Sequence, residues 1–226
     1  MGILALVGGD EFRENCIEMD RYILSLASRS KPNVVILPTA AAFENPQLAA
    51  QNGVRYFNTL GARTTAAMIL DHEDAHNREK TAPLEHADII YLTGGDPWHL
   101  LSAFKGSPAW DTMLKCYQKG GIVAGSSAGA MVLSGKMRNQ DSSGWIDALN
   151  LAGGIAVLPH HDSSRPDNIK SLRDSLEPEI ALIGISAATA CIHTEHQTWH
   201  VAGNGLITLY RKHSCVVYGK DKRFSI

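Results

Sequence analysis

The run Gly125-Ser126-Ser127-Ala128-Gly129 places a serine between small residues, directly after the apolar segment 122–124 and before the apolar segment 131–133. This pattern matches the G-x-S-x-G nucleophile elbow, a sharp strand-to-helix turn that presents a serine hydroxyl at the end of a sheet. The N-terminus of the following helix would point at the serine, so backbone N–H groups there could stabilise an oxyanion. Ser127 is therefore the predicted nucleophile of a covalent hydrolysis.

A serine hydroxyl is a weak nucleophile at neutral pH and needs a general base, usually a histidine that an acid orients. The chain holds ten histidines, so proximity in the sequence does not select one. His160 and His161 directly follow Pro159 at the end of a predicted strand, on the same rim of the sheet as Ser127. His160 is the predicted base because of its position after Pro159.

The orienting acid is left open between Asp141 and Asp147, which give the chain order serine, aspartate, histidine. A loop-stabilising turn or a helix cap explains each of these two residues as well as catalysis does. Asp162 follows the histidine pair directly and is expected to cap the next helix or turn.

Short apolar runs alternate with helical patterns in the first half of the chain. The predicted strands there cover residues 3–7, 33–37, 64–70, 88–93 and 122–124. This alternation predicts an α/β fold with a mostly parallel sheet and helices on both faces. Ligands bind beyond the carboxyl ends of the strands in such sheets, where Gly94-Gly95 and the serine turn both lie.

The pattern changes after the serine turn. Residues 138–151 are polar and are predicted to form a loop over the site, followed by a strand at 155–158. Residues 181–218 are predicted to form several short strands, as a C-terminal antiparallel extension of the sheet. Because no linker or repeat interrupts the chain, we expect a single domain over 1–226.

The composition excludes several classes of partner. The net charge of −2 gives no electrostatic footprint for nucleic acid or an anionic membrane. No apolar run approaches the length of about 20 residues that spans a membrane, and the first residues are predicted to form a strand rather than a signal peptide. The four cysteines lack C-x-x-C spacing and are expected to be reduced thiols of a cytoplasmic protein: Cys16, Cys116, Cys191 and Cys215.

Three histidines within eight residues raise the question of a metal site. In a hairpin, however, His193 and His200 would be cross-strand neighbours with His196 in the turn, and this interpretation is favoured. No cluster has a recognisable metal-ligand spacing, so no metal and no cofactor are expected.

Several stretches of the chain, taken in order, resemble the peptidase E and cyanophycinase family of serine peptidases. The resemblance spans nearly the whole chain and implies the flavodoxin-like fold of class I glutamine amidotransferases. It is carried by Leu6-Val7-Gly8-Gly9, Tyr91-Leu92-Thr93-Gly94-Gly95-Asp96 with His99-Leu100-Leu101, Gly125-Ser126-Ser127-Ala128-Gly129-Ala130, Asp147-Ala148-Leu149-Asn150-Leu151 with Pro159-His160, and Gly184-Ile185, Thr189-Ala190 and 199–205.

Carried over residue by residue, the resemblance implies Ser127 as nucleophile and His160 as base, with Asp141 as the best-placed acid. Gly95 and Ala128 would supply the oxyanion N–H groups. The residues expected to bind the substrate are Arg138, which matches a family arginine, and His161 and Arg165, which lie in or beside the predicted site segments.

The sequence departs from the family pattern in two places. Ser186-Ala187-Ala188 stands where relatives often carry acidic residues, and His161 stands where an aromatic residue is usual. These departures leave the substrate open between an aspartyl dipeptide and a cyanophycin-like polymer.

We therefore expect a serine peptidase that cleaves a short, aspartate-containing peptide, with the oligomeric state, including a homodimer, left open. An α/β-hydrolase-type esterase shares the chain order but is disfavoured by the second glycine turn and the β-rich tail. A catalytically silent relative that binds a small metabolite is the alternative outside enzymes. Amidotransfer is excluded because that chemistry uses a cysteine at the elbow.

Overall fold

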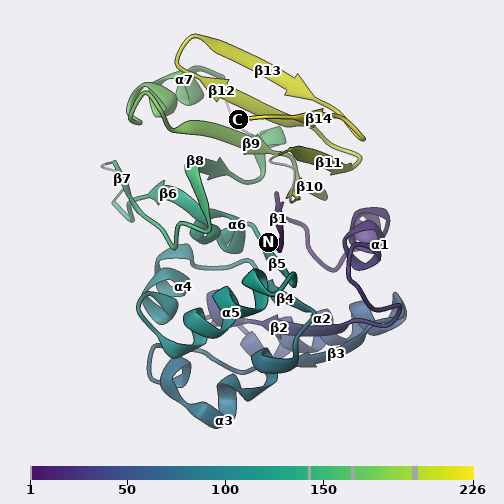
Figure 1. Cartoon of the computed structure of the whole chain (residues 1–226). Helices are drawn as coiled ribbons and strands as arrows, with labels where there is room; N and C mark the ends of the chain where they lie inside the picture. The colour runs from purple at the N-terminus through teal and green to yellow at the C-terminus, as the bar shows by residue number, and fades with distance from the viewer. Residues whose placement is uncertain (1, 142–143, 164–165, 195–197) are drawn as a thin grey trace.

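The computed structural model describes residues 2–141, 144–163, 166–194 and 198–226 (Figure 1). Within these ranges the strands form two sheets. In spatial order, the eight-stranded sheet contains β14 (Arg223–Phe224), β11 (Trp199–Gly203), β10 (Thr189–His193), β1 (Ile3–Val7), β5 (Ile122–Ser126), β4 (Ile89–Leu92), β2 (Asn33–Leu37) and β3 (Arg63–Ala66). The six-stranded sheet contains β13 (Ser214–Tyr218), β12 (Ile207–Arg211), β9 (Ala181–Ile185), β8 (Ala152–Leu158), β6 (Ser134–Arg138) and β7 (Trp145–Asp147).

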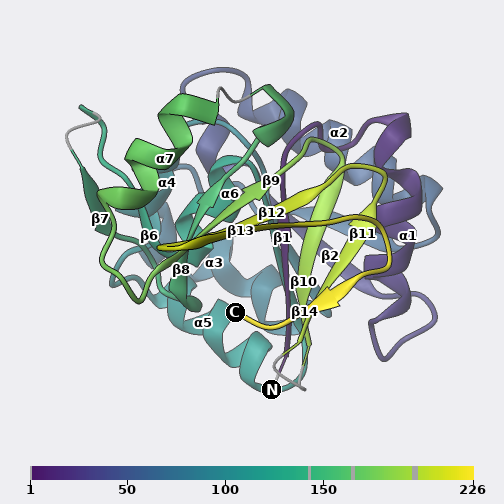
Figure 2. The same ribbon diagram turned by 90° about the horizontal axis from the view of Figure 1, so that it is seen from above.

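The helices lie mainly in the first two thirds of the chain. In the described residues they are α1 (Ile17–Ser25), α2 (Pro46–Thr59), α3 (Arg78–Thr81), α4 (Pro97–Phe104), α5 (Pro108–Gln118), α6 (Ala128–Leu133) and α7 (Pro166–Asp174). Prolines at the first helical positions of α4 and α5 and serine or aspartate caps before them fix where these helices begin. Figure 2, seen from above, shows α7 lying over the second sheet.

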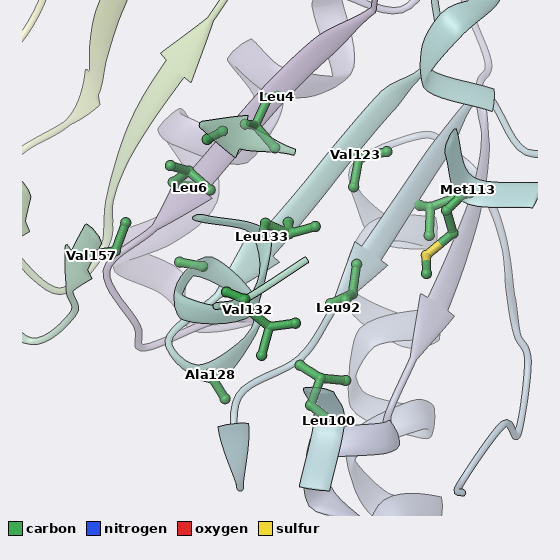
Figure 3. Packing of buried hydrophobic residues seen from close by; sticks show 14 of the residues in the cluster. Leu4, Leu6, Leu92, Leu100, Met113, Val123, Ala128, Val132, Leu133 and Val157 are labelled. Atoms are coloured by element: carbon green, nitrogen blue, oxygen red, sulfur yellow. The ribbon is translucent and has the colours of Figure 1, made fainter. Parts of the chain in front are cut away.

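Helices cover both faces of the parallel part of the first sheet, as the sequence predicted. Alternate residues of β1 point to opposite faces, so Leu4 and Leu6 pack with one set of helices and Ala5 and Val7 with the other. One face packs against α4, α5 and α6; Figure 3 shows Leu100 and Met113 of α4 and α5 in this cluster. The opposite face packs against α1 and α2. Both faces of these strands are therefore buried against apolar side chains, which explains why their sequence is continuously apolar.

The prediction of a mostly parallel sheet is wrong, and the predicted C-terminal antiparallel extension accounts for only some of the late strands. The first sheet is mixed. The strands β1, β5, β4, β2 and β3, in this spatial order, are parallel to one another, whereas β10, β11 and β14 each pair antiparallel with their neighbours. The other late strands build a second mixed sheet, in which β8 pairs in parallel with both β6 and β9. The fold class is α/β with mixed sheets, and the amidotransferase-like fold stays a prediction.

A corner between β9 and β10 explains why the sequence did not reveal two sheets. The amide of Ser186 donates to Leu206, directly before β12 of the second sheet, and two residues later the amide of Ala188 donates to Gly9, which follows β1 of the first sheet. Ala188 adopts a positive φ of 51° at this point. Two neighbouring apolar runs thus enter different sheets through a short turn, and apolar patterning alone does not distinguish this from an ordinary hairpin.

Two predicted boundaries also differ. The strand expected at 64–70 ends at Ala66. The amide of Ala67 still donates to Ile36 of β2, but the amide of Ile69 donates to the carbonyl of Ala67, so the chain turns at this point. The polar segment 138–151 is not simply a loop, because β7 lies within it and pairs with β6. Among the described residues, the search for a helix long and apolar enough to cross a membrane found none.

A buried carboxyl group sits between α1 and α2. Asp20 is fully buried, and its Oδ2 accepts a hydrogen bond from the Tyr56 hydroxyl at 2.8 Å. Burial is the main cause that raises the pKa of Asp20 from 3.8 to about 7, against the opposing hydrogen bond from Tyr56. Because the pKa is higher in the folded chain than in the unfolded one, this group costs stability as the pH rises from about 4 to about 7.

Asp20→Asn should remove this pH dependence while keeping an oxygen that accepts from Tyr56. The unfolding free energy of the variant, relative to the original protein, should rise between pH 4 and pH 8 by at most about 4 kcal/mol, at about 1.4 kcal/mol per pKa unit. Urea titrations at several pH values measure this difference. Ser102→Ala, on the exposed side of α4, changes no titratable group and is the control; it should give a difference independent of pH. A constant difference for Asp20→Asn would show that Asp20 is ionised in both states.

Candidate active site

Ser127 lies at the turn between β5 and α6, as the elbow pattern predicted. Its φ of 49° and ψ of −105° are unusual for a residue with a side chain, and its amide donates to the carbonyl of Val7 at 2.9 Å. Gly125 and Gly129, on either side of Ser127 in the sequence, have no room for a side chain because other backbone atoms lie close to them. A Cβ on Gly125 would lie 2.5 Å from the backbone of Gly129, and one on Gly129 would lie 2.7 Å from the carbonyl oxygen of Leu92.

His160 faces this serine: its Nε2 lies 3.1 Å from Ser127 Oγ. The amide of His160 donates to Gly8 at 2.8 Å, and its φ of 51° turns the chain directly after β8. Gly9 makes room for the ring, because a Cβ there would lie 2.0 Å from His160 Cε1. The turn after β1 therefore positions the imidazole against the serine.

The second glycine turn, between β4 and α4, completes the same rim. Gly95 has a φ of 136°, and a Cβ there would lie 2.2 Å from the carbonyl oxygen of Ala40, so only glycine fits. Asp96 then caps α4 by accepting from the amides of Trp98 and His99. The oxyanion role predicted for the amides of Gly95 and Ala128 stays a prediction.

A cavity of about 890 Å³ opens at this rim and is lined by Gly94, Gly95, Ser127 and His160. It runs along the first turns of α2 and beyond, where Asn45, Asn52 and Arg55 line it. Charged residues of both signs border it, namely Asp10, Glu11, Arg13, Glu44 and Arg55. A chamber of this size and polarity can take a short peptide.

The two acids left open by the sequence are both exposed. Asp147 pairs with Lys136 at 3.1 Å on the hairpin of β6 and β7, and Asp141 lies near the tip of that hairpin. Neither is among the residues that line the cavity. The assignment of the orienting acid stays a prediction.

Asp162 makes a contact that the sequence did not predict. Its Oδ1 accepts from the amide of Ala187 at 2.9 Å, which ties the segment after His160 to the corner between β9 and β10. That hydrogen bond is the main cause that lowers the pKa of Asp162, and the nearby His160 and His161 lower it further.

The predicted substrate-binding residues lie apart from the cavity or outside the described residues. His161 points to the second sheet, where its Nε2 lies 2.9 Å from the Tyr210 hydroxyl, and burial lowers its pKa. The Arg138 guanidinium lies over the Trp145 ring, 5.6 Å from its centroid. Arg165 falls outside the described residues. Their roles in substrate binding stay predictions.

The histidine-rich hairpin has a different register from the one expected. His193 lies opposite Trp199 and His200 opposite Ile192, so the two histidines are not cross-strand neighbours. His196 lies outside the described residues. In the part of the chain that the structure describes, no group of three or more His, Cys, Asp or Glu residues could hold a metal ion.

Sequence reasoning missed Glu11, Arg13 and Arg55, which all line the cavity. Glu11 had a local signal, since a carboxylate that follows the Gly8-Gly9 turn after the first strand falls on the ligand-binding rim. Arg55 had none, because it reaches the cavity only through the packing of α2 on the sheet.

The model of Peptidase family S51 matches residues 3–202. The chain belongs to this family. Cyanophycinase of Trichormus variabilis is 25% identical over 216 residues, which cover 90% of this chain and 72% of that protein. An uncharacterized peptidase of Bacillus subtilis is 26% identical over 160 residues, covering 70% of this chain and 67% of that one.

Two solved structures resemble this one. The crystal structure of a peptidase from an acI-B1 actinobacterium has a TM-score of 0.89 and 27% identity, covering all of this chain and 97% of that one. A putative peptidase E protein from Listeria monocytogenes has a TM-score of 0.63 at 20% identity, covering 97% and 98%, and shares the fold. The chain is a serine-type peptidase.

The two adjacent histidines should behave differently when each is replaced by alanine. His160→Ala should lower kcat by about 10³ or more, because it removes the group that faces Ser127 Oγ. His161→Ala should leave kcat close to that of the original protein, change KM and lower the melting temperature, because the contact with Tyr210 is lost. Steady-state kinetics and thermal melts of both variants measure this. Loss of kcat in His161→Ala alone would show that the wrong histidine was chosen.

Proposed function

We propose that this peptidase hydrolyses a peptide bond in a short, aspartate-containing peptide, with Ser127 as nucleophile and His160 as general base. The observation that carries the proposal is the 3.1 Å contact between Ser127 Oγ and His160 Nε2 at the rim of the cavity. This distance is within the reach of a proton transfer from the hydroxyl to the imidazole.

The reaction would proceed through an acyl-enzyme. Ser127 Oγ attacks the carbonyl carbon of the substrate while its proton passes to His160 Nε2. The C–N bond then breaks as Nε2 gives that proton to the leaving amine, which leaves an ester on Ser127. A water molecule gives a proton to Nε2 and attacks the ester, and Nε2 returns the proton to Ser127 Oγ.

Two turns would stabilise the negative charge of the tetrahedral intermediate. Ala128 is the first residue of α6, where a helix leaves its N–H groups without intrahelical acceptors. Gly95 lines the same cavity as Ser127 from the other turn. Donors fixed before the reaction begins stabilise the charge without reorganisation, and the loss of one costs about 10²–10³ in rate.

The aspartate preference is supported by the cations of the cavity and by similarity to proteins named cyanophycinase. Arg13 lies 3.5 Å from Asp10, so its charge is partly compensated. Arg55, on the exposed side of α2, lines the cavity with no acidic partner recorded among the described residues. We therefore favour Arg55 over Arg138 as the group that recognises a substrate carboxylate.

Ser127→Ala should leave the fold intact and lower peptide hydrolysis by about 10³ or more. The original protein should react with a fluorophosphonate and the variant should not, as intact mass and a dipeptide panel can show. Ser102→Ala, on the exposed side of α4, is the matched control and should behave like the original protein. Labelling and hydrolysis that persist in Ser127→Ala would contradict the assignment. Turnover of simple esters together with hydrolysis of no peptide would favour the esterase.

Arginine variants test the substrate charge. The ratio of kcat/KM for an aspartyl and a matching asparaginyl peptide should exceed one in the original protein. Arg55→Met should lower that ratio about 10- to 100-fold, since a hydrogen bond to a charged group contributes about 1.5–3 kcal/mol. Arg138→Met is the matched control and should retain the ratio. A ratio near one before any substitution would exclude acidic selection, and a fall in Arg138→Met alone would reverse the assignment.

A further inference from the structure

One carboxylate joins the two turns that border Ser127. Glu11 Oε1 accepts from the amide of Gly94 at 2.6 Å, and its Oε2 accepts from the hydroxyl of Ser126 at 2.7 Å. These partners lie 83 and 115 residues away in the sequence. We propose that Glu11 is a positioning residue that sets the spacing of the two turns, and so the oxyanion site between Gly95 and Ala128.

The two hydrogen bonds act directly beside the groups that matter. Gly94 immediately precedes Gly95, so fixing its amide restrains the peptide plane that leads to the Gly95 N–H. Ser126 immediately precedes Ser127 and is fully buried, so its hydroxyl anchors the start of the strained serine turn. A Cβ on Gly94 would lie 2.9 Å from Glu11 Oε1 and 3.4 Å from Ser127 Cβ, so both side chains lie close to this glycine.

The backbone around Glu11 is held in an unusual conformation. Asp10 and Phe12, on either side of it, have positive φ values of 64° and 66°. Such residues each cost about 1–3 kcal/mol and persist only where the surroundings fix them. Three contacts restrain them here. The Asp10 carbonyl accepts from Cys16 Sγ, and the centroid of the Phe12 ring lies 5.4 Å from that of Tyr91 and 5.8 Å from that of Tyr56.

This geometry separates a positioning role from a purely electrostatic one. A glutamine side chain can still accept from the amide of Gly94 through its oxygen, and its NH₂ group can donate to the Ser126 hydroxyl, which also accepts. Glu11→Gln therefore keeps both connections and removes the charge. Glu11→Ala removes both connections. The inference rests on the proposed function, because it concerns the charge that develops when Ser127 attacks.

The test is the kinetics of fluorophosphonate labelling, which needs no knowledge of the natural peptide. The rate at saturation, kinact, reports the covalent step at Ser127, whereas KI reports binding of the probe. We expect Glu11→Ala to lower kinact about 100-fold with KI changed less than about threefold, the size of effect seen when one oxyanion donor is lost. Glu11→Gln should retain kinact within about fivefold. Glu14→Ala, an exposed acid three residues away, should match the original protein.

Other outcomes would contradict either the inference about Glu11 or the proposed function. A kinact of Glu11→Ala within threefold of the original protein would overturn the inference, and so would Glu11→Gln as slow as Glu11→Ala. Labelling that persists in Ser127→Ala would instead contradict the proposed function. If Glu11→Ala does not fold, Ser126→Ala decides, because it removes only the Oε2 connection: a fall in kinact of about tenfold supports the inference, and a change within twofold overturns it.

Discussion

Three consecutive carbonyl groups at the end of β1 organise the site. The carbonyl of Val7 accepts the amide of Ser127, that of Gly8 accepts the amide of His160, and that of Gly9 accepts the amide of Ala188. The nucleophile, the base and the corner between the two sheets are thus hydrogen-bonded to one short piece of backbone. Because hydrogen bonds to a buried strand leave little freedom, this piece helps to fix the relative position of Ser127 and His160.

The same arrangement explains where the chain tolerates strain. Ser127 and His160 both have positive φ values, as do Asp10, Phe12 and Ala188 around them. Only glycine fits at positions 8 and 9. A Cβ on Gly8 would lie 2.0 Å from the carbonyl oxygen of Ser186, and one on Gly9 would lie 2.0 Å from His160 Cε1. The apolar core that packs against both faces of β1 offsets the free-energy cost of these backbone conformations. Unfavourable conformations of this kind concentrate at functional sites.

Local patterns in the sequence led to the predictions for the site. Ser127 was selected because small residues, an apolar strand and a helix start are all close to it in the chain, and His160 because it follows a strand end. The structure brings these two side chains to within 3.1 Å of each other. The second sheet could not be found in this way, since β9 and β10 look alike and separate only at a three-residue corner. Arg55 reaches the cavity through the packing of α2 on the sheet, which no local pattern encodes, whereas the position of Glu11 after the Gly8-Gly9 turn was a local signal.

The most direct test of this account is a crystal structure of the protein after reaction with a fluorophosphonate. We predict a bond between phosphorus and Ser127 Oγ, with the phosphoryl oxygen within hydrogen-bond distance of the amides of Gly95 and Ala128 and with His160 Nε2 beside the phosphonylated Oγ. An adduct on another residue, or a phosphoryl oxygen that points away from both amides, would contradict it.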